Sequence, residues 1–179
     1  SIRPPEIIDQ LAIGNILYVD FDTLVLLITE TKTLSHGFLK AKIISSGSLG
    51  SNKGIVLDPQ IDRKINLPTL SKKDVSAIEL GLTNNISHVA ASFMRNKESV
   101  QYVRDISQGR MKIISKIECK DALQNLNDVI KESDFLLIDR GDLSKEIPIE
   151  KIPFTQKIII DRAKSYNKRV FVATNLLES

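Results

Sequence analysis

The chain has 179 residues, a formal net charge of +3 and one cysteine, so it can hold one ordinary domain or two small ones and cannot form an internal disulfide. Its lysines and arginines are interspersed among acidic residues, which argues against a nucleic-acid-binding protein. The longest apolar runs, such as residues 24–28, are far too short to span a membrane and no apolar signal segment is seen at the amino terminus, so we expect a cytoplasmic protein.

Residues 1–66 have the composition of a small β region. Runs rich in β-branched and aromatic residues cover residues 16–19, 24–29 and 38–45, and polar, turn-like segments separate them. The first turn, Asp20-Phe21-Asp22, contains no glycine, so it needs a conformation different from that of a glycine-containing hairpin turn. His36, in the next loop, is expected to be solvated.

Residues 47–54 have the sequence GSLGSNKG, in which glycines flank Lys53. Glycines beside a lysine can form a nest for a phosphate anion. The segment is not a P-loop, because Asn52 precedes the lysine, Gly54 follows it and a strand-like run follows at residues 55–57. The preferred interpretation is a hinge between the β region and the rest of the chain, and a phosphate-binding loop remains an alternative.

From residue 67 onward, helical and strand-like patterns alternate. Helices are expected from Ser71, where Asp74 forms a variant of the capping box, and over residues 97–107, about 119–130 and about 153–166. In the first helix Val75, Ile78, Leu80 and Leu82 are expected to face the core. Strands are expected at residues 88–93, near 112, at 135–138 and at 169–174. This alternation predicts parallel βαβ units.

Charged residues follow two of these strands. Lys116 and Glu118 lie two apart, on one face of an extended segment, and Asp142 follows the next strand. Two hard oxygen ligands can hold Mg²⁺ or Mn²⁺, and a lysine beside them can neutralise transferred charge. Spacing alone leaves open an ordinary ion pair at a strand end. Cys119 is interpreted as a small structural thiol, and His88, at a strand start, as structural.

Seven motifs occur in one order along nearly the whole chain: GSLGSNKG, LPTLSKKD, AASFMR, KIISKIE, RGDLS, EIPIEK and VATNLLES. Together they resemble the pyruvate kinases. The resemblance implies an α/β fold, with a partial (β/α)₈ TIM barrel over residues 67–179 preceded by a small β remnant of the lid domain and its hinge over residues 1–66. Four strands cannot close a barrel, so we expect either an excised portion or completion by another segment or subunit of an oligomer.

The resemblance also implies phosphoryl transfer between phosphoenolpyruvate and ADP, giving pyruvate and ATP. It assigns Glu118 and Asp142 to a divalent Mg²⁺ or Mn²⁺, and Lys116 to the phosphoryl group in flight. It places Thr174 beside the enolate carbon that is protonated. The substrate-binding residues that it implies are Arg140, Gly141, Asp142 and Thr174, and Lys53 is a weak candidate for the nucleotide phosphates. The K⁺ site of the family lies mostly in strands that this chain lacks. The intact protein is expected to be an enzyme, and this chain alone to be inactive.

Three residues depart from the family pattern. Asp139 replaces the small residue before RGD, Ser144 replaces a glycine, and Asn175 replaces a glutamine. Asp139 adds a carboxylate where the substrate carboxylate docks, and at about 4 Å two such charges repel by about 4 kcal/mol at a dielectric near 20, or about a thousandfold in affinity. Pairing of Asp139 with Arg140 or Lys112, or a role as a further metal ligand, would relieve this repulsion. Two alternatives stay open: an inactive pyruvate kinase-like binding protein, and a metal-dependent lyase or aldolase acting on a 2-oxo acid.

Overall fold

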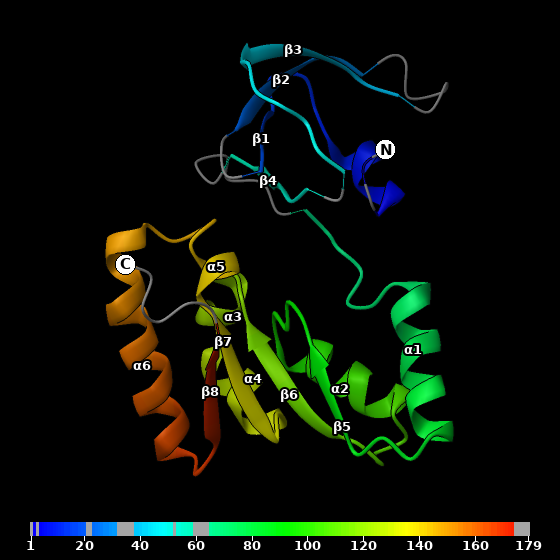
Figure 1. Cartoon of the computed structure of the whole chain (residues 1–179), viewed down its shortest axis with the longest axis vertical. Helices are drawn as coiled ribbons and strands as arrows, with labels where there is room; N and C mark the ends of the chain where they lie inside the picture. Colours follow the sequence, from blue (N-terminus) through cyan, green and yellow to red (C-terminus); the bar gives the residue numbers. More distant parts are fainter. Residues whose placement is uncertain are drawn as a thin grey trace. The chain divides into compact units, whose positions relative to one another are not determined.

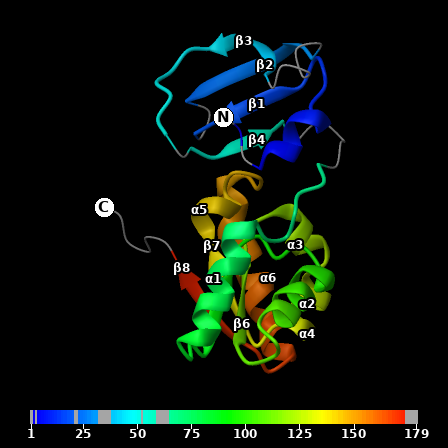
Figure 2. The same ribbon diagram turned by 90° about the vertical axis from the view of Figure 1, so that its right-hand side faces the viewer.

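The computed structural model describes residues 2, 4–20, 23–31, 38–51, 53–58 and 65–173. The chain divides into two compact units, Ser1–Pro68 and Thr69–Ser179. Figure 1 shows the elements of both units, and Figure 2 shows the same ribbon turned by 90°. The first unit is built mainly of β-strands and the second of alternating strands and helices.

A four-stranded antiparallel sheet forms the first unit, in the order β3-β2-β1-β4. Its elements are the 3₁₀ helix η1 (Pro5–Gln10) and the strands β1 (Ile16–Val19), β2 (Leu24–Glu30), β3 (Lys40–Ser45) and β4 (Ile55–Leu57). Leu11, Leu17 and Ile28 form its small buried core. The strands that the sequence predicts are confirmed, with β3 beginning two residues later than expected.

The turn after β1 uses an aspartate where a hairpin often has glycine. Asp20 has a φ of 53°, in the left-handed region that aspartate tolerates better than most residues. Its carbonyl oxygen accepts hydrogen bonds from the Thr23 amide (3.2 Å) and hydroxyl (2.6 Å). Phe21 and Asp22 lie outside the described residues, as does His36.

The second unit contains a four-stranded parallel sheet in the order β5-β6-β7-β8, and Figure 1 shows these strands side by side. The strands are β5 (His88–Ala91), β6 (Lys112–Ile117), β7 (Phe135–Asp139) and β8 (Arg169–Ala173). The helices are α1 (Lys72–Thr83), α2 (Lys97–Ile106), α3 (Lys120–Gln124), α4 (Leu126–Glu132), α5 (Arg140–Leu143), the 3₁₀ helix η3 (Ile149–Lys151) and α6 (Ile152–Ser165). This arrangement confirms the predicted parallel βαβ units of a partial barrel. None of the described helices has the length and apolar character needed to cross a membrane.

One face of the parallel sheet packs against the helices. In β6 the side chains of Ile113, Ser115 and Ile117 are fully buried, and those between them are not. The same alternation holds in β7, where Leu136 and Ile138 are buried. Helices α1, α2, α4 and α6 contribute large buried side chains to this core, including Ile78, Leu82, Val100, Val103, Val129, Ile130 and Ile159. The other sheet face, which would line the inside of a closed barrel, is less buried.

Helix α1 begins at the predicted capping box, but one of the residues expected to face the core is exposed. The Ser71 amide donates to Asp74 Oδ2 (2.8 Å), and the Asp74 amide donates to Ser71 Oγ (3.2 Å), which completes a capping box. Ile78 and Leu82, four residues apart, are buried together. The expected inward position of Leu80 is wrong, because a residue two positions along a helix points to nearly the opposite side, and Leu80 is 64% exposed.

The helix expected over residues 119–130 is divided at Asn125. The Asn125 amide side chain donates to the carbonyl oxygens of Asp121 (3.0 Å) and Arg95 (3.1 Å). Asparagine side chains compete in this way with the backbone bonds that would continue a helix. The apolar residues on both sides, Ala122 and Leu126, are still buried as expected.

Asp134, just before β7, accepts hydrogen bonds from residues of α2 and β6. Its Oδ2 accepts hydrogen bonds from the Ile113 amide (2.9 Å) and Arg104 (3.2 Å), and its Oδ1 accepts one from Lys112 (3.1 Å). Burial raises the pKa of this carboxyl, but these three donors outweigh that effect, and the net pKa lies below its ordinary value of 3.8. The ionised carboxylate therefore stabilises the folded state.

We expect Asp134→Asn to lower the free energy of unfolding by about 2 kcal/mol at pH 7, because charge-assisted hydrogen bonds are lost. The folded pKa lies below the unfolded one, so this stabilisation is present above about pH 4 and is lost as the pH falls through the folded pKa. The difference between the two proteins should therefore shrink below about pH 4. Urea denaturation across this range measures it, with the exposed Asp105→Asn on α2 as control, expected within about 0.5 kcal/mol. A difference that does not change with pH would contradict the charged role.

Candidate active site

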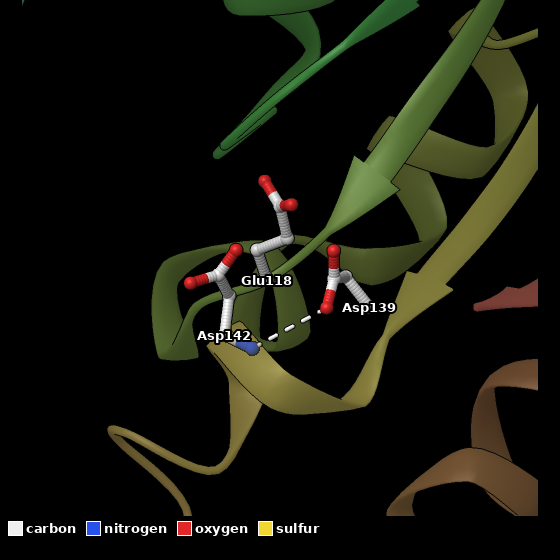
Figure 3. A group of neighbouring side chains, drawn as sticks. All are labelled: Glu118, Asp139 and Asp142. Atoms are coloured by element: carbon white, nitrogen blue, oxygen red, sulfur yellow. Dashed lines mark hydrogen bonds between the residues drawn. The ribbon is translucent and has the colours of Figure 1, made fainter. Parts of the chain in front are cut away.

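The carboxyl ends of β5, β6 and β7 meet at one edge of the parallel sheet, here called the carboxyl edge. Glu118 directly follows β6, Asp139 is the last residue of β7, and Asp142 lies in α5, the short helix that follows β7. Figure 3 shows the three carboxylates close to one another, and one oxygen from each lies within 4.8 Å of the others. The structure therefore brings together Glu118 and Asp142, as the sequence predicts, and adds Asp139.

Glu118 is the most buried of the three, with a fully buried side chain. Its Oε1 lies 2.5 Å from Lys116 Nζ, and its Oε2 accepts a hydrogen bond from the Phe93 amide (2.8 Å). Burial raises the pKa of Glu118, and the contacts with Lys116 and the Phe93 amide oppose that rise. Glu118 is thus held in place by an ion pair at one oxygen and a backbone hydrogen bond at the other.

Lys116 lies between carboxylates from two strands. Its ammonium is 2.5 Å from Glu118 Oε1 and 3.5 Å from Asp139 Oδ2, and it donates a hydrogen bond to Ser92 Oγ (3.2 Å). Burial lowers the pKa of Lys116, but pairing with Glu118 and Asp139 outweighs burial, and the net pKa is raised. The lysine is therefore a fixed positive charge at neutral pH.

The segment after β5 supplies two further contacts. Ser92 accepts the hydrogen bond from Lys116, which places Ser92 in the wall of the site. Phe93 has a φ of 53°, a left-handed conformation that is uncommon for a bulky residue. Its amide N–H points at Glu118. Sequence reasoning missed this donor because a backbone N–H has no residue type that marks it.

Asp139 has a cation as partner, the ammonium of Lys116, which the sequence analysis did not consider. Lys112 pairs with Asp134 instead, and the ammonium beside Asp139 belongs to Lys116. Asp139 Oδ1 also accepts the Asp142 amide N–H, at 3.4 Å (Figure 3). Since this distance is near the limit for a hydrogen bond, the contact is weak.

The turn after α5 carries a second lysine. Lys145 Nζ contacts Asp142 Oδ1, and the Lys145 amide donates to the Asp142 carbonyl oxygen (3.1 Å). Ser144, which replaces a glycine of the family pattern, donates its hydroxyl to the Gly141 carbonyl oxygen (2.8 Å). Sequence reasoning missed Lys145, although its spacing of three residues from Asp142 in a helical turn is a recognisable signal.

The remaining candidate residues lie in α5, in the first unit or outside the described residues. Arg140 and Gly141 form the first turn of α5. Thr174 and Asn175 lie outside the described residues, directly after β8. Lys53 belongs to the first unit, where its Nζ lies 2.8 Å from Asp20 Oδ2. The structure thus assembles Lys116, Glu118, Asp139, Asp142 and the backbone of residues 140–142 into one site.

Cys119 is buried at the start of α3. Burial raises the pKa of its thiol to about 11, so almost none of it is the reactive thiolate at neutral pH. This environment agrees with the structural role that the sequence favours. The oxygen donors of the carboxyl edge, by contrast, are the type that Mg²⁺ and Mn²⁺ prefer, and the spacing of the three carboxylates fits one such ion.

Comparison with known proteins shows the family of the chain. The family model for the pyruvate kinase barrel domain matches residues 1–179. The chain is 32% identical to the pyruvate kinase of Sporosarcina psychrophila over 183 residues, covering 100% of this chain and 30% of that protein. The corresponding values for the Dictyostelium discoideum pyruvate kinase are 33% over 182 residues, 100% and 35%, and for that of Agaricus bisporus 34% over 169 residues, 93% and 31%. The chain thus spans about a third of the length of these curated relatives, and it belongs to the pyruvate kinase family.

Proposed function

We propose that this chain supplies the metal-binding and phosphoryl-transfer part of a pyruvate kinase active site, which transfers a phosphoryl group between phosphoenolpyruvate and ADP and forms pyruvate and ATP. The observation that carries the proposal is the position of the Lys116 ammonium beside the carboxylates of Glu118, Asp139 and Asp142. A lysine and several carboxylates at the carboxyl edge of a barrel sheet match the needs of phosphoryl transfer, which depends on positioned charge.

Glu118 and Asp142 are the proposed ligands of Mg²⁺ or Mn²⁺, and Asp139 lies close enough to be a third. A bound divalent ion would neutralise charge on the transferred group and on the substrate oxygens. Lys116 offsets the charge that spreads over the equatorial oxygens of the phosphoryl group, because its raised pKa keeps it positive. The fixed partners of Lys116 hold its charge at one position during transfer.

The substrate carboxylate is proposed to bind the backbone amides of residues 140–142. Of these, the Asp142 amide already donates to Asp139, through a long contact that a ligand can replace. Thr174 is proposed to assist protonation of the enolate carbon, and Lys53 to contact the nucleotide phosphates. The same proposal includes K⁺ as a second cofactor, completion of the barrel by another segment or subunit, and a cytoplasmic location.

A second candidate, an inactive pyruvate kinase-like binding protein, is favoured by Asp139 and Lys145. Asp139 accepts a hydrogen bond from the Asp142 amide, which is one of those proposed for the substrate carboxylate. Lys145 pairs with Asp142, a proposed metal ligand. A lyase or aldolase acting on a 2-oxo acid would need the same metal carboxylates to stabilise an enolate, without a nucleotide.

The test is pyruvate formation by the intact protein from phosphoenolpyruvate, Mg²⁺ and K⁺, measured with and without ADP. We expect pyruvate only with ADP, together with an equal amount of ATP. Release of pyruvate and an aldehyde from a 4-hydroxy-2-oxo acid, without a nucleotide, would replace the kinase proposal with the aldolase, whereas pyruvate formed from phosphoenolpyruvate without ADP would show only hydrolysis. No pyruvate under either condition, in a folded protein, would favour the inactive binding protein.

A further inference from the structure

The carboxyl edge is compensated by charges of the chain itself. Its three carboxylates are met by two ammonium groups, Lys116 beside Glu118 and Asp139, and Lys145 beside Asp142. A divalent ion that enters this site therefore meets carboxylates that already have cationic partners.

Lys145 is placed where it must interact with such an ion. The side chains of Asp142 and Lys145 are 28% and 25% exposed, so their ion pair lies in a partly desolvated environment, where charges interact more strongly than in water. Both residues belong to one short stretch of backbone, in which the Lys145 amide donates to the Asp142 carbonyl oxygen (3.1 Å). The ammonium is therefore brought to Asp142 by local structure, at little cost in chain entropy.

The two lysines of the site differ in what a metal would disturb. Lys116 has two carboxylate partners, Glu118 and Asp139, and keeps Asp139 if Glu118 turns to a metal. Lys145, by contrast, contacts Asp142, which is itself a proposed metal ligand. A divalent ion that takes an Asp142 oxygen must therefore displace Lys145 or bind within a few ångströms of its positive charge.

We propose that Lys145 is an internal competitor of the divalent metal: its ammonium stands in for a cation at Asp142 and weakens metal binding. The inference rests on the proposed metal role of Glu118 and Asp142, and it assigns to Lys145 a regulatory function at that site. Removing the charge while keeping the length of the side chain, as in Lys145→Met, should tighten Mn²⁺ binding about tenfold.

The experiment measures Mn²⁺ binding to the intact protein by water proton relaxation, without substrate or turnover. Lys145→Arg keeps the charge and should bind Mn²⁺ within about threefold of the unmodified chain. Lys157→Met removes an exposed charge from α6 and should have no effect beyond about twofold. Asp142→Ala should abolish the specific site and defines the background. Circular dichroism confirms folding, and Lys145→Gln serves as a second neutral variant.

The outcomes separate this inference from the proposed function. Tighter Mn²⁺ binding by Lys145→Met and Lys145→Gln, with Lys145→Arg unchanged, supports competition. Equal or weaker binding by the neutral variants, in a chain whose Mn²⁺ site still depends on Asp142, overturns the competitor role and leaves the metal site standing. Absence of Asp142-dependent binding in every variant overturns both.

Discussion

Lys116→Met is expected to lower phosphoryl transfer by the intact protein about a thousandfold or more while Mn²⁺ binding is retained. The ammonium of Lys116 is fixed by Ser92, Glu118 and Asp139, and its charge is needed most where negative charge develops in the transition state. Removing a positive charge beside carboxylates cannot weaken their electrostatic attraction for a cation. Turnover, measured as ADP-dependent pyruvate formation, and Mn²⁺ relaxation therefore report two separate properties.

Lys112→Met is the matched control. Lys112 lies four residues earlier on the same strand and face as Lys116, at the opposite end of β6, and pairs with Asp134. Its replacement should leave turnover within about threefold of the unmodified protein, since no proposed reacting group lies near it. Turnover that survives in Lys116→Met refutes the catalytic role, and loss of Mn²⁺ binding in that variant shows that Lys116 instead holds the carboxylates in place.

Periodicity explains why the centre of the site could be found from the sequence. Residues two apart on a strand share a face, and parallel strands end at one edge, so the sequence predicts that Lys116, Glu118 and Asp142 lie close together. The structure confirms that they meet. Their roles in metal binding and phosphoryl transfer remain predictions.

The contacts that the sequence does not predict join residues of different segments. The sequence suggests Arg140 or Lys112 as a partner of Asp139 and does not suggest Lys116. Strand register pairs the α-carbon of Lys116 with that of Leu137 in β7, and the Lys116 ammonium lies beside Asp139. The Phe93 amide reaches Glu118 only because the chain turns through a left-handed residue after β5. Neither a register nor a backbone direction is encoded by one residue type.

The wrong predictions within the helices have local causes instead. Leu80 is apolar and was assigned to the core, but the helical period turns it away from Ile78 and Leu82. Asn125 interrupts a continuous apolar pattern because its side chain binds backbone carbonyl oxygens on two segments. Apolar periodicity therefore located the helices well and their internal breaks poorly.

Asp139 bears on substrate binding more directly than any other departure from the family pattern. Its Oδ2 lies 3.5 Å from the Lys116 ammonium, and its Oδ1 accepts the Asp142 amide N–H. Both groups are proposed to bind phosphoenolpyruvate, so the Asp139 carboxylate competes with the substrate for the same donors. Because Lys116 partly neutralises it, the repulsion is smaller than the thousandfold expected for an unpaired charge.

Asp139→Ala should therefore bind phosphoenolpyruvate about ten to a hundredfold more tightly than the unmodified protein in the presence of Mg²⁺. Asp139→Asn keeps the shape and an acceptor for the Asp142 amide but removes the charge, so it separates electrostatic repulsion from competition for that amide. Calorimetric titration of the intact protein with phosphoenolpyruvate measures both variants. If affinity stays the same or falls in Asp139→Ala, the carboxylate has a constructive role, and a parallel loss of Mn²⁺ affinity would identify that role as a third metal ligand beside Glu118 and Asp142.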